Sequence, residues 1–192
     1  MKKERDLLIV IDLQNVYLPG EEWMCPSMRE AVKNICTLLD SGTVEQAIFT
    51  RFTAPQKPQG TWKNYNEVNA EVNADARLNE MVEEIRPYLG RYPLYDKSTY
   101  SSMRIAALAE AAKRADRILL SGVVAECCVL ATMLEAIDDG HRVVYLTDCV
   151  SGQSEANEMA IRRIAESFAP VHTEVMDSRT WIAQARAGQK VE

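Results

Sequence analysis

The chain has 192 residues, of which 47% are hydrophobic and 26% charged, and its formal net charge at pH 7 is -6. This composition is typical of a soluble globular protein and this length of a single domain, so we expect one domain over residues 1–192. An acidic chain without a basic stripe is not typical of nucleic-acid binders, so we expect no nucleic-acid partner.

The N-terminal apolar run is short. It covers residues 7–11, whereas a signal sequence needs roughly 7–15 apolar residues and a membrane span about 20. We therefore expect a cytoplasmic protein without a membrane partner. The five cysteines are odd in number and lack the CxxC pairs of a zinc site. In a reducing cytoplasm Cys25, Cys36 and Cys149 are interpreted as small buried hydrophobic residues.

Apolar runs alternate with helical patterns along the chain. Residues 7–12 are almost purely aliphatic, which indicates a strand buried on both faces. The helical patterns are recognised by apolar spacing and by glycine or proline near their ends. In chain order we predict a helix at 28–39, a strand at 46–51, a helix at 79–89, a weaker strand at 92–97, a helix at 101–115, a strand at 117–122, a helix at 128–139, a strand at 142–147, a helix at 154–168, a strand at 171–176 and a helix at 181–187.

This alternation predicts right-handed βαβ units. The expected fold class is α/β, a three-layer α/β/α Rossmann-like fold with a six-stranded, mainly parallel sheet. Residues 53–74 contain Pro55, Pro58, Gly60 and many polar side chains. We expect a long irregular loop there, and loops of this length in compact domains are often functional.

Three reactive side chains fall at strand ends. Asp12 ends the first strand, Lys97 ends the third, and Cys128 follows the fourth. In an open parallel sheet, ligands bind outside the carboxyl ends of the strands. A carboxylate that takes a proton, a cation that favours charged forms and a thiol together indicate a nucleophilic site. Taken singly, Asp12 is also compatible with a turn cap and Lys97 with a solvated side chain.

The segment from Leu119 to Val129 points to the nucleophile. An apolar run ends in Ser121-Gly122 and is followed by a cysteine at the expected start of a helix. Backbone N–H groups at a helix start are unpaired and carry partial positive charge. They are expected to favour a thiolate and to supply donors for an oxyanion beside it.

The chain resembles the isochorismatase-like cysteine hydrolases, a family that includes nicotinamidases, N-carbamoylsarcosine amidase and ureidoacrylate amidohydrolases. The resemblance covers roughly residues 7–176 and lies in IVIDLQN (9–15), KSTYS (97–101), GVVAECCV (122–129) and Asp148. It implies Asp12 as general base, Lys97 as catalytic lysine and Cys128 as nucleophile. It also implies a homo-oligomer, a dimer or tetramer.

The two adjacent cysteines are distinguished by the residues that come after them. The family cysteine is usually followed by Val and precedes a Thr by four residues, which Cys128 does with Val129 and Thr132. Cys127 is then a packing or pocket-wall residue.

The resemblance also implies a non-prolyl cis peptide between Val123 and Val124, which would direct an N–H at the oxyanion. The backbone donors implied are those of Cys128 and of Val124 or Ala125. Ala125 replaces the usual Thr, so one hydroxyl contact of the family is in doubt.

The family's metal ligands have no counterpart here. Metal-dependent nicotinamidases carry Asp-x-His after the second strand, where this chain reads Arg51-Phe52-Thr53. The two histidines, His141 and His172, are interpreted as structural or surface residues. We expect no metal and no cofactor, and nicotinamidase activity is disfavoured.

Five side chains are candidates for substrate binding: Gln14, Trp62, Tyr65, Tyr100 and Glu126. Trp62 and Tyr65 either line the pocket or anchor their loop, because aromatic residues do both. Glu126 either binds a cationic or N–H-rich substrate or caps the helix as an N-terminal acid.

The predicted function is a metal-independent cysteine hydrolase that cleaves a C–N bond of a small amide, ureide or carbamoyl compound through a thioester. One alternative is vinyl-ether hydrolysis of the isochorismatase kind, although some members of that branch lack the cysteine. A second is a non-catalytic small-molecule-binding protein that retains the fold. A third, a redox sensor using Cys127 and Cys128, is disfavoured because adjacent cysteines close a strained disulfide.

Overall fold

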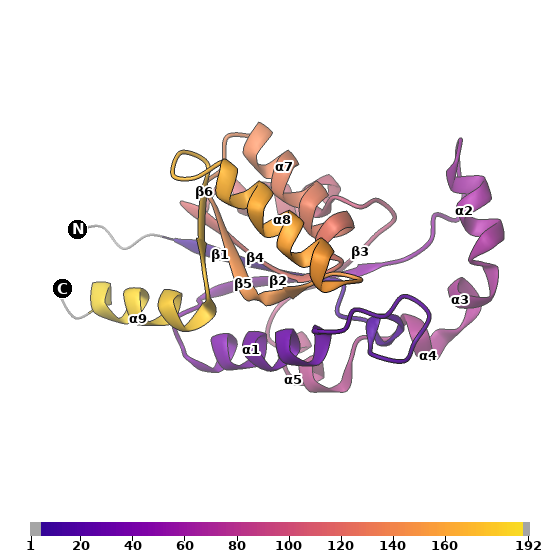
Figure 1. Ribbon diagram of the computed structural model, residues 1–192, viewed down its shortest axis with the longest axis horizontal. Coiled ribbons are helices and arrows are strands. Elements are labelled where there is room, and N and C mark those ends of the chain that lie inside the picture. Colours follow the sequence, from indigo (N-terminus) through magenta and orange to yellow (C-terminus); the bar gives the residue numbers. More distant parts are fainter. Residues whose placement is uncertain (1–4, 190–192) are drawn as a thin grey trace.

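The computed structural model describes residues 5–189, which form a six-stranded sheet covered by helices on both faces (Figure 1). The strand order is β3-β2-β1-β4-β5-β6, and every neighbouring pair is parallel. The predicted fold class is confirmed, with a sheet that is wholly rather than mainly parallel. The strands are β1 (Asp6–Ile11), β2 (Gln46–Phe52), β3 (Leu94–Lys97), β4 (Arg117–Val123), β5 (Val143–Ser151) and β6 (Thr173–Met176).

The central strand β1 explains why its sequence is apolar without alternation. Leu8 and Val10 belong to the core on one face of the sheet, whereas Leu7, Ile9 and Ile11 belong to the core on the other. Both faces are covered, so both sets of side chains are apolar.

Two groups of helices form the outer layers (Figure 1). α1 and α9 cover one face, where Ile35 and Trp181 are buried, and α6, α7 and α8 cover the other, where Leu108, Met133 and Ile161 are buried. The α-helices are α1 (Met28–Asp40), α2 (Trp62–Val68), α3 (Ala70–Ala74), α4 (Ala76–Asn79), α5 (Arg86–Leu89), α6 (Ala106–Ala112), α7 (Leu130–Asp138), α8 (Glu155–Ser167) and α9 (Ser178–Gln189).

The predicted helix at 79–89 is wrong. Met81 forms an antiparallel bridge with Gln14, and the N–H of Val82 donates to the carbonyl of Leu13 at 2.9 Å. These contacts with the segment after β1 interrupt the helical spacing, so only short helices remain on either side. They are α4, the 3₁₀ turn η2 (Glu83–Ile85) and α5.

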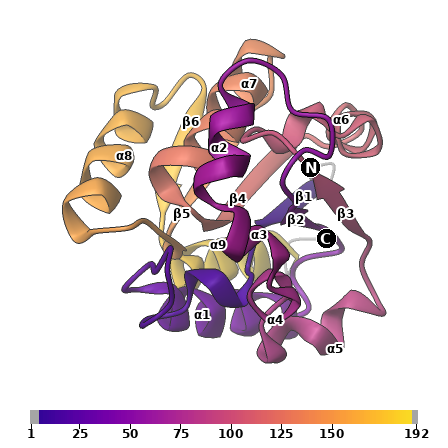
Figure 2. The same cartoon turned by 90° about the vertical axis from the view of Figure 1, so that its right-hand side faces the viewer.

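The predicted irregular loop at 53–74 is also wrong over most of its length. Pro55, Pro58 and Gly60 all lie before α2, and the polar residues beyond them form α2 and α3. Two views show these helices beyond the carboxyl ends of the strands (Figures 1 and 2). The segment therefore lies over the edge where a site is expected.

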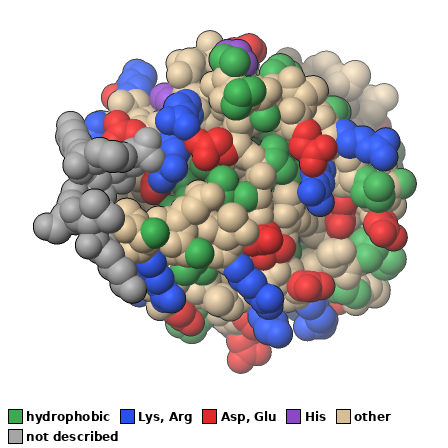
Figure 3. Space-filling model, turned by 60° about the vertical axis from the view of Figure 1, so that its left-hand side comes forward, with side chains coloured by type: hydrophobic (Ala, Val, Ile, Leu, Met, Phe, Trp, Pro, Cys, Tyr) green, Lys and Arg blue, Asp and Glu red, His purple; other side chains and the backbone are tan. Residues whose placement is uncertain are grey.

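On the face drawn in Figure 3, Lys and Arg side chains are interspersed with Asp and Glu rather than gathered into one patch. None of the helices between residues 5 and 189 is long and apolar enough to cross a membrane.

Candidate active site

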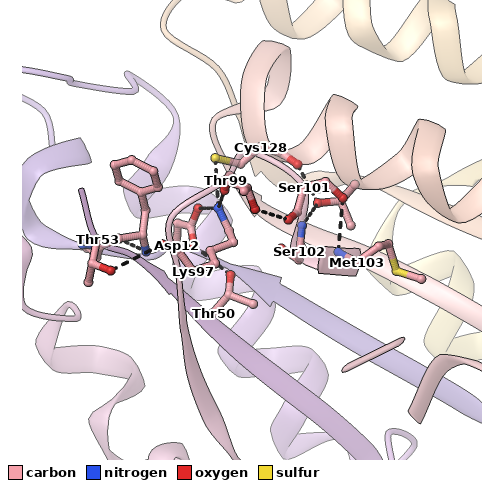
Figure 4. Close-up of polar contacts among 12 residues, drawn as sticks. Asp12, Thr50, Thr53, Lys97, Thr99, Ser101, Ser102, Met103 and Cys128 are labelled. Carbon is pink, nitrogen blue, oxygen red and sulfur yellow. Dashed lines mark hydrogen bonds and ion pairs between the residues drawn. The ribbon is translucent and has the colours of Figure 1, made fainter. Parts of the chain in front are cut away.

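Asp12, Lys97 and Cys128 meet at the carboxyl edge of the sheet (Figure 4). The Lys97 ammonium lies 2.6 Å from Oδ2 of Asp12 and donates to Sγ of Cys128 at 3.3 Å. The three residues are only 0%, 5% and 3% exposed. The structure thus brings together the three residues singled out from the strand ends. Together with Thr50, they form what we call the catalytic floor, after the role that we propose for it below.

Asp12 is positioned by its backbone and by β2. It follows β1 directly and has a left-handed backbone conformation, with φ 53°, which is uncommon outside glycine. Its N–H donates to the carbonyl of Thr50 at 3.1 Å, and the Thr50 hydroxyl donates to Oδ1 at 2.7 Å. One carboxylate oxygen is held by Thr50, so the other faces Lys97.

The turn beside Asp12 also requires glycine in β4. Gly122 has φ +108°, and a Cβ there would lie 2.1 Å from the carbonyl oxygen of Ile11. Only glycine allows the two backbones to approach so closely. The end of β4 is thereby fixed next to the end of β1, one residue before Asp12.

Lys97 reaches the site from the edge strand β3. Its ammonium passes near the Phe52 ring, 5.4 Å from the ring centroid, and also donates to the carbonyl of Thr99 at 3.0 Å. Three polar atoms thus surround a group with three N–H bonds. Burial by itself lowers the pKa of Lys97, but the charges of Asp12 and Cys128 outweigh it and the pKa is raised. Lys97 is a buried cation and not a solvated side chain.

Cys128 lies in η4 (Ala125–Val129), a π-helical turn that precedes α7. Burial raises the pKa of its thiol, and the nearby Asp12 carboxylate adds to the rise, against the opposing effect of Lys97. The thiol is therefore protonated at neutral pH. Burial and the Asp12 charge thus oppose the resting thiolate that the helix start was expected to favour.

The backbone around Cys128 is fixed by a hydroxyl. The Thr132 hydroxyl donates to the carbonyl of Cys128 at 2.7 Å and accepts from the N–H of Ser102 at 2.9 Å. This links the segment of Cys128 to the turn after β3. It also gives a structural reason for a threonine four residues after the cysteine.

The peptide bond between Val123 and Val124 is cis, at the position that the resemblance implied. The N–H groups of Cys127 and Val129 both donate to the carbonyl of Val124, at 3.0 and 3.2 Å. Cys128 stands between these two residues in the sequence, near the end of the turn.

A cavity of about 150 Å³ opens beside Cys128. Five of its lining residues are aromatic and are called the aromatic wall: Tyr17, Trp23, Phe52, Tyr65 and Tyr100. The other lining residues are Asn69, Val124, Cys127, Cys128 and Gln153.

Two of the five predicted substrate-binding residues, Tyr65 and Tyr100, line this cavity. Trp62 packs behind them, with its ring centroid 5.0 Å from that of Tyr65 and 5.3 Å from that of Tyr100. Cys127 is half-buried at the wall, as the comparison of the two cysteines anticipated.

Gln14 does not face the cavity, and its assignment to substrate binding is corrected. It is 1% exposed, and its amide donates to the carbonyls of Phe52 and Asn79 at 3.0 and 3.2 Å. Its oxygen accepts from the N–H of Phe52 at 2.8 Å. These hydrogen bonds fix the end of β2 at Phe52, whose ring is part of the aromatic wall.

Glu126 is likewise corrected. Its Oε1 accepts from the side chain of Asn157 at 2.5 Å and from the N–H of Gln153 at 3.1 Å. It neither caps its own helix nor lines the cavity. Glu126 fastens the segment before α8, which carries Gln153 at the cavity rim.

The sequence analysis missed Tyr17, Trp23, Phe52, Asn69 and Gln153. Tyr17 and Phe52 could have been predicted from the sequence. Tyr17 follows β1 and Phe52 ends β2, so both belong to the carboxyl edge of the sheet, where ligands bind. The other three lie on loops or short helices whose approach to the site depends on the folded chain.

No group of three or more His, Cys, Asp or Glu side chains in the described part of the chain is arranged to hold a metal ion. His141 and His172 precede β5 and β6, so they lie at the amino edge of the sheet, opposite the catalytic floor.

Several solved structures share this fold. A cysteine hydrolase from Pseudomonas syringae pv. phaseolicola is 19% identical, with a TM-score of 0.80 over 97% of this chain and 95% of that one. An isochorismatase family protein from Desulfovibrio vulgaris is 18% identical, with a TM-score of 0.78 over 93% and 96%. The MAR1 ribonuclease from Caenorhabditis elegans is 20% identical, with a TM-score of 0.67 over 95% and 81%.

A search among curated proteins finds no match to the chain. The family model of the Isochorismatase domain matches residues 6–174, which include the whole catalytic floor. The protein therefore belongs to the isochorismatase family of hydrolases.

Proposed function

We propose that the protein is a metal-independent cysteine hydrolase that cleaves a C–N bond of a small amide, ureide or carbamoyl compound. One observation carries this proposal: the buried ammonium of Lys97 contacts both Asp12 and Cys128, at 2.6 and 3.3 Å. A cation shared by a carboxylate and a sulfur stabilises negative charge on either of them. A proton passing from sulfur to carboxylate then leaves the net charge of the floor unchanged.

The first half of the reaction is acyl transfer. Asp12 accepts the thiol proton of Cys128, and the sulfur forms a bond to the substrate carbonyl carbon. The resulting oxyanion is bound by the backbone N–H of Cys128 and by that of Val124 or Ala125. Collapse of this intermediate breaks the C–N bond. The leaving nitrogen takes the proton held by Asp12, and ammonia or an amine departs.

The second half restores the enzyme. Asp12, again ionised, takes a proton from a water molecule as the water oxygen attacks the thioester carbon. The C–S bond breaks, the acid product leaves, and Asp12 returns the proton to Cys128. Lys97 stays protonated throughout, because its pKa is raised by the two groups that it neutralises.

The name of the nematode protein states an activity on RNA, which we do not extend to this chain. Proteins bind the phosphate backbone largely through Lys and Arg side chains. The residues lining this cavity include none, and the chain carries a net charge of -6.

The test is ammonia release from a panel of small amides, ureides and carbamoyl compounds, with a chelator in a parallel series. The expected result is release that survives chelation and is lost, by at least about 10³-fold, in Cys128→Ala and in Asp12→Asn. Release that persists in Cys128→Ala, or that stops when metal is removed, would contradict the proposal.

A further inference from the structure

The cavity beside Cys128 is uncharged. Its lining residues, among those that the structure describes, include no Asp, Glu, Lys, Arg or His. The nearest buried cation is Lys97, whose three N–H bonds already face Asp12, Thr99 and Cys128. A carboxylate on the substrate would therefore lose its hydration without gaining an ionic partner, which is unfavourable.

Tyr17 lines this cavity with a side chain that carries a hydroxyl. The residue is 5% exposed. The residue is held on both sides, because its N–H donates to Gln14 at 3.1 Å and its carbonyl accepts from Cys25 at 2.8 Å. The ring also packs on Trp23, with centroids 5.9 Å apart. The ring position is thus fixed independently of the hydroxyl.

The Tyr17 hydroxyl makes no hydrogen bond with any residue between 5 and 189. The hydroxyl is not one of the fully buried polar atoms without a partner, so water or a ligand in the cavity can reach it. Burial raises the pKa of Tyr17 well above its ordinary value, and the Asp12 carboxylate adds to the rise. The hydroxyl is therefore neutral and able to donate, and the residue lines the same cavity as Cys128.

The other two tyrosines of the wall are less restricted. Tyr100 is 44% exposed, so solvent satisfies its hydroxyl. Tyr65 is half-buried on α2. Tyr17 is the least exposed tyrosine of the wall, so its hydroxyl relies most on a molecule inside the cavity for a hydrogen bond.

Resting on the proposed cysteine hydrolase function, we propose that the substrate is uncharged and carries a hydrogen-bond acceptor beyond the reacting carbonyl, and that the Tyr17 hydroxyl binds this acceptor. Tyr17 is then a specificity-determining residue. It selects among small amides without taking part in the proton transfers between Asp12 and Cys128.

The test uses three amides of nearly equal shape. Malonamide is uncharged and has a second carbonyl acceptor, 3-methylbutanamide replaces that group by methyl groups, and malonamate replaces it by a carboxylate. A parallel series based on succinamide is one methylene longer, which places the acceptor farther from the reacting carbonyl. Binding is measured by calorimetry on Cys128→Ala, in which the bound amides cannot form a thioester.

In at least one series we expect the diamide to bind about tenfold more tightly than either analogue, which corresponds to one neutral hydrogen bond and one avoided desolvation. Adding Tyr17→Phe should abolish the preference over the methyl analogue and leave the affinity for that analogue within about twofold. Tyr92→Phe is the matched control, because Tyr92 is also buried (7% exposed) but stands before β3, at the amino edge. It should change neither affinity.

Three results would overturn the inference: a carboxylate analogue that binds as tightly as the diamide in both series, a diamide preference that survives Tyr17→Phe, or no binding by any amide. Hydrolysis is followed separately in the enzyme with Cys128 intact. Selective binding without ammonia release would refute the proposed function and leave the assignment of Tyr17 standing. Ammonia release that depends on Cys128, without selective binding, would support the proposed function and refute the assignment of Tyr17.

Discussion

The catalytic floor and the aromatic wall of the same cavity are built in different ways. The floor comes from the ends of β1, β2 and β3 and from the turn after β4, and its side chains contact one another directly. The wall comes mainly from short helices and loops, and the rings of Tyr17, Trp23, Tyr65 and Phe52 meet in turn with centroids about 6 Å apart. Charge is concentrated in the floor and absent from the wall.

This difference separates two tasks. The floor is almost completely buried, so its charges interact strongly and their geometry is restricted. Under the proposed function the wall contacts the substrate, so changes there should alter substrate binding more than the chemical step. Substitutions in the two regions should therefore affect kcat and KM differently.

The largest effect is expected from Lys97→Met. Removing the ammonium leaves the Asp12 carboxylate buried without its cation, which typically costs about 3–5 kcal/mol of stability. Proton transfer from Cys128 also loses its charge stabilisation, and kcat should fall by about 10³-fold. Steady-state kinetics and chemical denaturation measure both. Lys113→Met, which removes an exposed partner of Glu110, is the control and should change neither.

Unchanged stability in Lys97→Met, together with unchanged kcat, would show that the floor does not depend on its cation. Loss of stability with full activity would show that Lys97 is structural only.

Gln14→Leu should mainly affect stability. The substitution leaves the N–H and carbonyl of Phe52 and the carbonyl of Asn79 without partners, which should cost about 1–3 kcal/mol. The reacting groups are untouched, so kcat should change far less than in Lys97→Met. Gln153→Leu, at the exposed cavity rim, should leave the denaturation midpoint unchanged. Equal stability losses in both variants would contradict the assignment of Gln14.

Stability should decrease on the alkaline side of the pH range. Burial raises the pKa of the Cys128 thiol above its ordinary value of 9.0, and burial also raises the pKa of Cys149. Above about pH 9 the unfolded chain loses these protons while the folded chain keeps them, so increasing pH favours unfolding. The raised pKa of Lys97 acts in the same direction.

Chemical denaturation between about pH 7 and about pH 10 tests this dependence. A free energy of unfolding that stays constant or increases over that range would mean that these groups are not buried as the structure shows.

The smallest effect is expected from Trp62→Leu, which changes the support of the wall but not its surface. Loss of the ring contacts with Tyr65 and Tyr100 should weaken substrate binding by roughly 0.5–1.5 kcal/mol, a rise in KM of about two- to tenfold. The value of kcat should be nearly constant. A larger fall in kcat than rise in KM would contradict the division between floor and wall.

The same division explains how much could be predicted from the sequence. The strands are apolar runs, and their alternation with helices implies that their carboxyl ends meet, so Asp12, Lys97 and Cys128 could be brought together before the structure was known. The expectation failed where tertiary contacts prevail over local pattern. Gln14 lies near a strand end like Asp12, yet its side-chain amide forms hydrogen bonds with the backbone of Phe52 and does not face the cavity.

The protonation of Cys128 could not be predicted either, because it depends on burial and on the distance to Asp12. The wall was visible only in part. Tyr65 and Tyr100 were named from their loop and strand end, whereas Trp23 and Gln153 come from segments that approach the cavity only in the folded chain.

The most direct test of the central claim is the intact mass of the enzyme, quenched with acid during turnover of its most active amide. The account predicts an added mass equal to the acyl group, located by peptide mapping on Cys128 and absent from Cys128→Ala. Turnover without any adduct on Cys128, together with activity retained in Cys128→Ala, would contradict the account.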